Sequence, residues 1–268
     1  MIAWKLRIWR TASAAAVVSA VAACGDASNQ TSDTPATPSG PAIDDGAAPA
    51  PVGEGGEAGE AGAASAYAGL SGAQLSALRL AHLEGFILVA ATVNEQNMPT
   101  EAAILIQQGL LEVYDGAPPA EFGDLNPSLV RSAGEDTSLT RAQMDERIRA
   151  ARAEIDRAAG ALNVDGAIVV ARMVDIATGL YQQVNQADYV DPMEYQHSMG
   201  AALAARAALL AHRDALRRKD AAAFNETQSA LNRFIELWPQ ATAPERPTPY
   251  RDVLAQSSRV RLALSPYL

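Results

Sequence analysis

One long and almost wholly apolar helix constrains the fold of this chain more than any other feature. Residues 72–96 have helical start and stop signals, and between positions 81 and 93 only His82, Glu84 and Thr92 are polar. A helix that is apolar on nearly every side is usually buried by other elements. We therefore expect this helix to be central, with further helices packed around it.

Local signals downstream predict six further helices. The start signals are the capping-box pairs Ser71–Gln74 and Thr140–Gln143 and the N-cap aspartates Asp191 and Asp220. The expected helices span residues 72–96, 99–114, 140–159, 164–187, 191–219, 220–238 and 248–265. Residues 115–139, rich in proline and glycine, are the one long segment expected to be irregular.

The composition supports an all-α fold. Hydrophobic residues make up 49% of the chain and are rich in alanine, whereas aromatic residues make up only 5%. That balance favours closely packed helices over sheets, which prefer β-branched and aromatic residues. Residues 67–268 are therefore expected to form one helical bundle of about seven helices.

Charge and cysteine content exclude several functions. The formal net charge is −10, which argues against a nucleic-acid partner because such proteins use basic side chains to neutralise phosphates. Cys24 is the only cysteine, so neither an internal disulfide nor a cysteine-based zinc site can form. Phosphate-cradling glycine loops and hydrolase nucleophile motifs are also missing from the sequence, and we expect a protein that is not an enzyme.

The N-terminus has the features of a secretory signal. Residues 1–10 are basic, and residues 11–23 form an apolar run too short to span a bilayer. The run ends in Val21-Ala22-Ala23-Cys24. This sequence resembles the lipobox of bacterial lipoproteins, in which a branched residue and two small residues precede a cysteine.

The resemblance implies that residues 1–23 are a signal peptide and that Cys24 carries the lipid. Its thiol would receive diacylglycerol, and its new amine would usually be acylated, for example with palmitate. Two or three acyl chains anchor a protein stably at a membrane. Because Gly25 follows the cysteine, the expected location is the outer membrane, facing the periplasm. The alternative is an ordinary secreted protein in which Cys24 happens to lie near the cut.

Residues 24–66 are expected to be the lipidated cysteine and a tether. This stretch is rich in glycine, proline and acidic residues and has no basic residue. It has too few apolar side chains to offset the entropy of ordering. The sequence therefore predicts a disordered linker between the membrane and the helical domain.

One motif suggests metal binding. Glu194 and His197 form a Glu-x-x-His pair on one helix face, and the motif occurs in ferritin-like di-metal bundles. Such sites need two of these motifs, and the sequence has one. A site for a single transition-metal ion would need ligands from another helix, and His82 or Glu84 are the candidates.

Helical geometry limits that hypothesis. His82 and Glu84 lie about 200° apart around their helix, so they cannot both face one small site. The alternative is that His82 is a hydrogen-bonded core histidine and Glu84 a paired core acid. The basic run 213–219 is most simply a helix C-terminus that complements the helix dipole; the alternative is a contact with anionic lipid or a partner.

The sequence thus predicts a lipid-anchored envelope protein whose helical domain is a binding or scaffold module. Its expected partners are the membrane, through the lipid anchor, and an unidentified envelope protein, and it needs no cofactor. The runner-up is a periplasmic metal-binding protein that handles iron, copper or zinc, with Glu84, Glu194 and His197 as candidate ligands.

Overall fold

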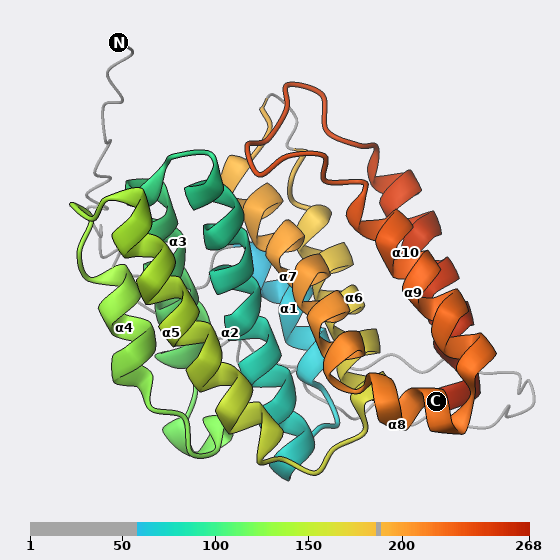
Figure 1. Ribbon diagram of the computed structural model, residues 1–268. Coiled ribbons are helices and arrows are strands. Elements are labelled where there is room, and N and C mark those ends of the chain that lie inside the picture. The colour runs from blue at the N-terminus through green and yellow to red at the C-terminus, as the bar shows by residue number, and fades with distance from the viewer. Residues whose placement is uncertain (1–57, 186–188) are drawn as a thin grey trace, which may run out of the picture. The chain divides into compact units, whose positions relative to one another are not determined.

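Helix α2 (Gly72–Glu95) lies at the centre of the helical domain, in contact with α3, α5 and α7 (Figure 1). The computed structural model describes residues 58–185 and 189–268. These residues form ten α-helices and three shorter helical turns and contain no strand, which confirms the all-α class. The other elements are α1 (Ala58–Tyr67), α3 (Pro99–Gly109), η1 (Leu110–Tyr114), η2 (Pro119–Phe122), α4 (Pro127–Gly134), α5 (Arg141–Gly160), α6 (Gly166–Tyr181), α7 (Pro192–Ala211), α8 (Arg213–Lys219), α9 (Ala221–Ile235), α10 (Tyr250–Leu264) and η3 (Ser265–Tyr267).

The central position of α2 was expected from its composition. Leu78, Leu80, Leu83, Ile87 and Val89, which point to different sides of the helix, are all fully buried. Among the described residues, α2 is the one helix long and apolar enough to cross a membrane, but most of it is buried within the protein. Its apolar surface is thus accounted for by packing in the core.

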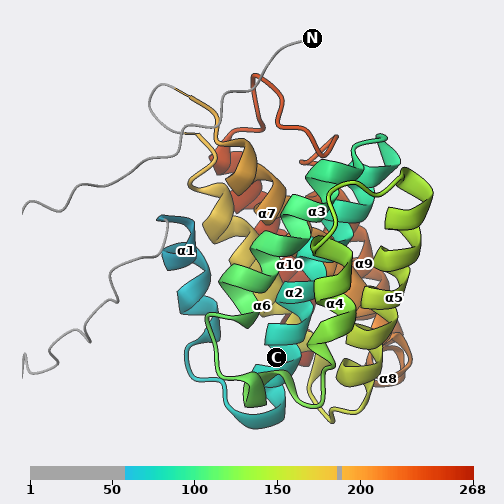
Figure 2. The ribbon, with the colours of Figure 1, turned by 90° about the vertical axis from the view of Figure 1, so that its left-hand side faces the viewer.

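Helices α2 and α7 lie in the middle of the domain, with other helices packed on their outer sides. Helices α4 and α5 lie on one side and the α9–α10 pair on the other (Figure 1). Helix α6 packs along α7, and α1 packs on α6 (Figure 2). This arrangement places α1, α2, α3 and α7 around a common space, which is the cavity described below.

Several helix starts follow the predicted chemistry. Thr140 and Gln143 form the reciprocal capping box at the start of α5. Asp191 and Asp220 accept hydrogen bonds from the first backbone N–H groups of α7 and α9. In each case the partners lie within four residues of one another, so the local sequence determines the contact.

The capping box predicted at Ser71 and Gln74 does not form. Ser71 precedes α2 but makes no side-chain cap hydrogen bond. The Gln74 side chain instead bonds the backbone of Asp165 twice: its Nε2 donates to the carbonyl oxygen at 3.2 Å, and its Oε1 accepts from the N–H at 3.0 Å. A contact between distant segments has replaced the local one.

The expected tether range is too long at its C-terminal end. Ala58–Tyr67 form α1, although residues up to 66 were expected to be disordered. The reason is local, because this run is rich in alanine, the strongest helix former. Ala63 and Ala66 lie one turn apart and are buried. Residues 1–57, including Cys24 and the lipobox, lie outside the described residues.

Two other expectations about element boundaries were also wrong. The segment expected to be irregular, 115–139, contains η2 and α4, and α4 begins with the side-chain cap of Asn126 followed by Pro127. The helix predicted over 191–219 breaks at His212 into α7 and α8. The ring of His212 lies against Gly166, where any larger residue would collide with it.

The two remaining differences affect the cavity. Helix α6 ends at Tyr181, earlier than the predicted 187. The helix predicted over 99–114 is α-helical only to Gly109 and continues as a π-helical turn, η1. There the backbone N–H of Asp115 donates to the carbonyl of Leu110, five residues earlier. π-Turns inside helices are rare and often occur at functional sites.

Candidate functional site

Helix α2 separates the candidate residues onto two of its sides. His82 lines a cavity together with Glu194 and His197 of α7. Glu84 lines a different space, a groove over α2 between α5 and α7. This agrees with the geometric prediction that His82 and Glu84 cannot face one small site. The structure thus joins His82 to the Glu-x-x-His pair and does not bring Glu84 to it.

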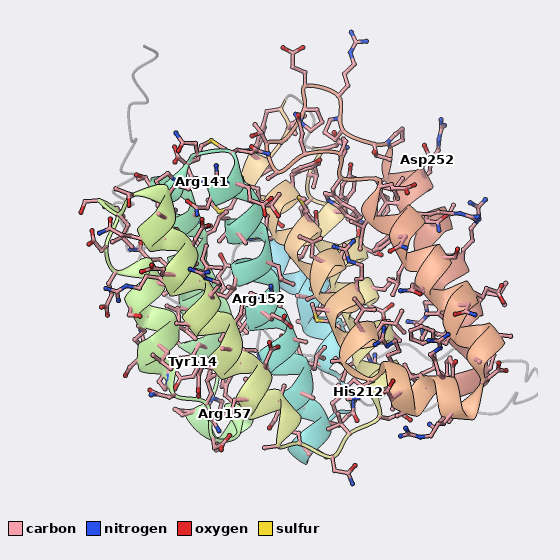
Figure 3. All side chains as sticks on the ribbon, in the orientation of Figure 1. Tyr114, Arg141, Arg152, Arg157, His212 and Asp252 are labelled. Carbon is pink, nitrogen blue, oxygen red and sulfur yellow. The ribbon has the colours of Figure 1, made fainter. Side chains whose placement is uncertain are left out.

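Glu84 is a paired acid at the base of the groove. It is 8% exposed, and its Oε1 lies 3.6 Å from Nη2 of Arg152, which reaches from α5 towards α2 (Figure 3). Burial raises the pKa of the Glu84 carboxyl to about 7, and the charge of Asp156 adds to the increase while Arg152 opposes it. This matches the alternative in which Glu84 is a core acid with an arginine partner.

The groove itself has a volume of about 830 Å³. Its floor consists of small or aliphatic side chains along one side of α2, among them Ala77, Ala81 and Leu88. Glu84 and Arg152, which both line it, lie 3.6 Å apart and interact with each other.

The cavity on the other side of α2 has a volume of about 720 Å³. Its polar side chains come from α1, α2, α3, η1 and α7; they include Tyr67, His82, Gln108, Glu112, Glu194 and His197. Phe86, Leu111, Leu180 and Met193 supply apolar surface. A concave space of this size, mostly apolar with a few convergent polar groups, is typical of a small-molecule site.

A close crossing of α2 and α7 brings the two histidines together. The backbones of the helices meet at Gly85 and Gly200. His82 and His197 each lie three residues before the glycine of their helix, hence about one turn away on the same side. The Phe86 ring lies between them, with its centroid 5.7 Å from that of His82 and 4.7 Å from that of His197.

His82 is held neutral. Burial lowers its pKa to about 3, with smaller contributions from His197 and Arg79. Its Nδ1 lies 2.6 Å from the hydroxyl of Tyr67. Burial raises the pKa of that tyrosine to about 12, so its hydroxyl stays protonated at neutral pH.

His197 is also neutral, because burial lowers its pKa to about 4 against the opposing charge of Asp191. Its Nε2 lies 3.2 Å from Oε1 of Gln108, which can only accept, so Nε2 carries the proton and donates. The lone pair is then on Nδ1, which lies 3.6 Å from Oε2 of Glu112. Two hydrogen-bond acceptors thus lie side by side in the cavity.

Arg79 is the only arginine or lysine in the cavity lining formed by the described residues. Its Nε donates to Oε2 of Glu121 at 3.0 Å, and its guanidinium lies 4.2 Å from the ring centroid of Tyr67. Glu121 therefore neutralises this cation. Two acidic side chains, Glu112 and Glu194, line the same cavity.

The described residues contain no group of three or more His, Cys, Asp or Glu side chains placed to hold a metal ion. His82 is separated from His197 by Phe86, and Glu84 is in the groove. Of the candidate ligands, His82, Glu194 and His197 line the cavity and Glu84 does not.

Sequence reasoning missed Tyr67, Arg79, Gln108 and Glu112. Tyr67 was placed at the edge of the tether, and Glu112 lies in a turn whose π geometry has no simple sequence signal. One available signal was overlooked, because His-x-x-Gly occurs in both the 72–96 and the 191–219 segments. That shared pattern marks the two faces that meet.

Comparison of the chain with known protein families, characterised proteins and solved structures finds no match.

Proposed function

We propose that this chain is a lipid-anchored protein of the cell envelope whose helical domain binds a small molecule in the cavity between α2 and α7. The lipobox Val21-Ala22-Ala23-Cys24 supports the anchor, and the acidic, glycine-rich segment after it supports a linker. An outer-membrane location facing the periplasm follows from the same resemblance.

The cavity is the observation that carries the binding function. Its volume of about 720 Å³ lies within the range of ligand pockets, and polar side chains from four helices and one π-turn converge on it. Two buried, hydrogen-bonded histidines, His82 and His197, are among these side chains. The same residues argue for binding and against acid–base catalysis, because pKa values of about 3 and 4 lie far below neutral pH.

A test of this function blocks each space in turn. Ala64 is exposed and lines the cavity, whereas Ala207 lines the groove. We expect a thermal-shift screen of the full chain against a diverse set of small molecules to yield binders. Ala64→Trp should abolish their stabilising effect, and Ala207→Trp should leave it intact. Binders lost only in Ala207→Trp would place the site in the groove and contradict the proposal.

Metal binding is a second candidate, with Glu112 in the place first considered for Glu84. Two ligands of one tetrahedral ion with bonds of about 2.1 Å lie about 3.4 Å apart. Nδ1 of His197 and Oε2 of Glu112 are 3.6 Å apart, and Glu194 lines the same cavity. Calorimetry with zinc, copper and ferrous ions tests this candidate. The metal candidate requires that one of these ions binds, that Glu112→Gln abolishes this binding, and that Glu84→Gln leaves it unchanged.

A further inference from the structure

Helix α1 forms one wall of the cavity. Its residues Ala63, Ala64 and Tyr67 line this space, and α1 packs on α6, which lines the cavity through Leu180 (Figure 2). It is also the first helix of the described residues, so its displacement leaves the course of the later helices unchanged. The cavity is therefore complete only while α1 is in place.

The composition of α1 predicts that it packs weakly. Apart from Tyr67, its residues are alanine, glycine, serine and one glutamate. An alanine buries only a methyl group and a glycine inside a helix is unfavourable, so α1 gains little free energy from its contact with the domain. A helix of 10 residues is not stable by itself in water. Helix α1 is thus an element of low local stability, which unfolds when it leaves the domain.

The connection from α1 to α2 has the features of a hinge. Gly69 and Gly72 have positive φ angles of 77° and 55°, in a region that favours glycine. Nothing lies within 4 Å of a Cβ built on either residue, so no neighbouring side chain fixes the backbone on that side. Moving elements commonly turn on short segments of this kind.

Tyr67 attaches α1 to α2. Its hydroxyl lies 2.6 Å from Nδ1 of His82, and the guanidinium of Arg79 lies 4.2 Å from the centroid of its ring. Tyr67 is the one large side chain of α1. Because His82 lines the cavity, this attachment of α1 lies in the wall of the site itself.

We infer that α1 is a lid of the cavity, which turns on the hinge at Gly69 and Gly72 and is held closed by the contact between Tyr67 and His82. This inference rests on the proposed binding function and names the element that regulates it. A ligand that touches α1 makes those contacts only in the closed state, so binding and closure stabilise each other. The apparent affinity is then proportional to the fraction of molecules in which α1 is closed.

Thiol labelling of the full chain measures the opening of the lid. Leu180→Cys places a thiol in the cavity wall, at a position that is 5% exposed, and Cys24→Ala removes the native thiol. The control, Val260→Cys, places a thiol on the buried side of α10, which packs on α9. With 4,4′-dithiodipyridine as the reagent, we expect the thiol at position 180 to react at least about tenfold faster than the thiol at position 260, because local opening costs less free energy than global unfolding.

Two tyrosine variants then assign the opening to α1. Tyr67→Phe keeps the ring and removes the hydroxyl, and it should make the thiol at position 180 react about five- to tenfold faster, the effect of losing one hydrogen bond. The matched control is Tyr195→Phe, which removes a hydroxyl that donates to the carbonyl of Gln240 instead. It weakens the domain elsewhere, so it should leave the rate at position 180 unchanged.

Hydrogen exchange of the parent chain links the lid to binding and needs no substitution. The backbone amides of residues 63–67 should exchange faster than those at the centre of α2. A binder from the thermal-shift screen, present at about a hundred times its Kd, should slow their exchange at least about tenfold.

The outcomes separate the lid from the function on which it rests. Equal labelling rates at positions 180 and 260, or the same acceleration at position 180 in both tyrosine variants, would mean that the cavity opens only by global unfolding. Either result overturns the lid and leaves the cavity as a binding site, and so does a binder that fails to slow exchange in α1. A screen without binders overturns the proposed function and the regulatory role of α1 together, whatever the labelling rates.

Discussion

Gly85 and Gly200 bring the backbones of α2 and α7 into direct contact. A Cβ on Gly200 would lie 2.5 Å from the carbonyl oxygen of Gly85, and a Cβ on Gly85 would lie 2.9 Å from the carbonyl oxygen of Gly200. In neither direction is there room for a methyl group, because the opposing atom belongs to the backbone. The crossing therefore requires glycine on both helices, and it sets the positions of the two histidines.

Gly200→Ala should destabilise the domain by about 1–3 kcal/mol, because the added methyl group must push two helices apart. The measurement is urea unfolding of the full chain. The control is Gly160→Ala at the end of α5, where nothing lies within 4 Å of the added carbon. That variant should be neutral or slightly stabilised, since alanine has the higher helix propensity. An equal loss in both variants would show that the crossing is not tight.

Glu84 should make stability fall as the pH rises. Its pKa is raised from 4.5 to about 7, so between these values the folded state binds more protons than the unfolded state. By linkage, the stability that Glu84 contributes is present below pH 4.5 and is lost towards pH 7. The free energy of unfolding of Glu84→Gln, taken relative to that of the parent, should therefore rise by on the order of 2 kcal/mol as the pH rises from 4.5 to 8. Parallel unfolding curves at these two pH values measure the difference, and a constant difference would contradict the raised pKa.

His197 should have the opposite effect on stability. Its pKa is lowered from 6.5 to about 4, so the unfolded state binds more protons in this interval. The stability linked to His197 is present above pH 6.5 and is lost as the pH falls towards 4. The free energy of unfolding of His197→Gln, taken relative to that of the parent, should rise by about 2 kcal/mol as the pH falls from 6.5 to 4.5. His212→Gln is the comparison, because that histidine is only partly buried and should recover less.

Cys24→Ala should abolish lipid attachment, because Cys24 is the only cysteine in the chain. Metabolic labelling with a fatty acid should mark the parent protein and leave the variant unmarked. Ser28→Ala, a few residues further along the chain, is a suitable control that should keep the label. Equal incorporation into parent and Cys24→Ala would contradict the lipoprotein resemblance.

The sequence predicted the elements whose signals are local. The all-α class, the central apolar helix and the caps at Thr140, Asp191 and Asp220 needed only neighbouring residues, and the structure confirms them. The separation of His82 from Glu84 followed from the helical repeat alone. Gln74 shows where such reasoning fails, because the backbone of Asp165, ninety-one positions away, competes successfully for its side chain.

The site was harder to predict than the fold because its residues are brought together by tertiary contacts. Glu194 and His197 were found through their spacing on one helix. Glu112 was not found, since it reaches His197 only when η1 packs beside α7. The structure also replaces one candidate ligand. Glu84 is more buried than Glu112, yet it faces the groove and pairs with Arg152, whereas Glu112 lies beside His197.

The π-turn at Leu110–Tyr114 makes the chemistry of the cavity sensitive to chain length. A π-turn holds one residue more than an α-turn, so this stretch can lose a residue and still remain helical. A deletion at position 110 or 111 would rotate Glu112 by about 100° relative to the helix before it. A single-codon deletion would then remove a carboxylate from His197 without any substitution. A change of length in η1 would therefore alter the acid that faces His197, while the crossing at Gly85 and Gly200 stays intact.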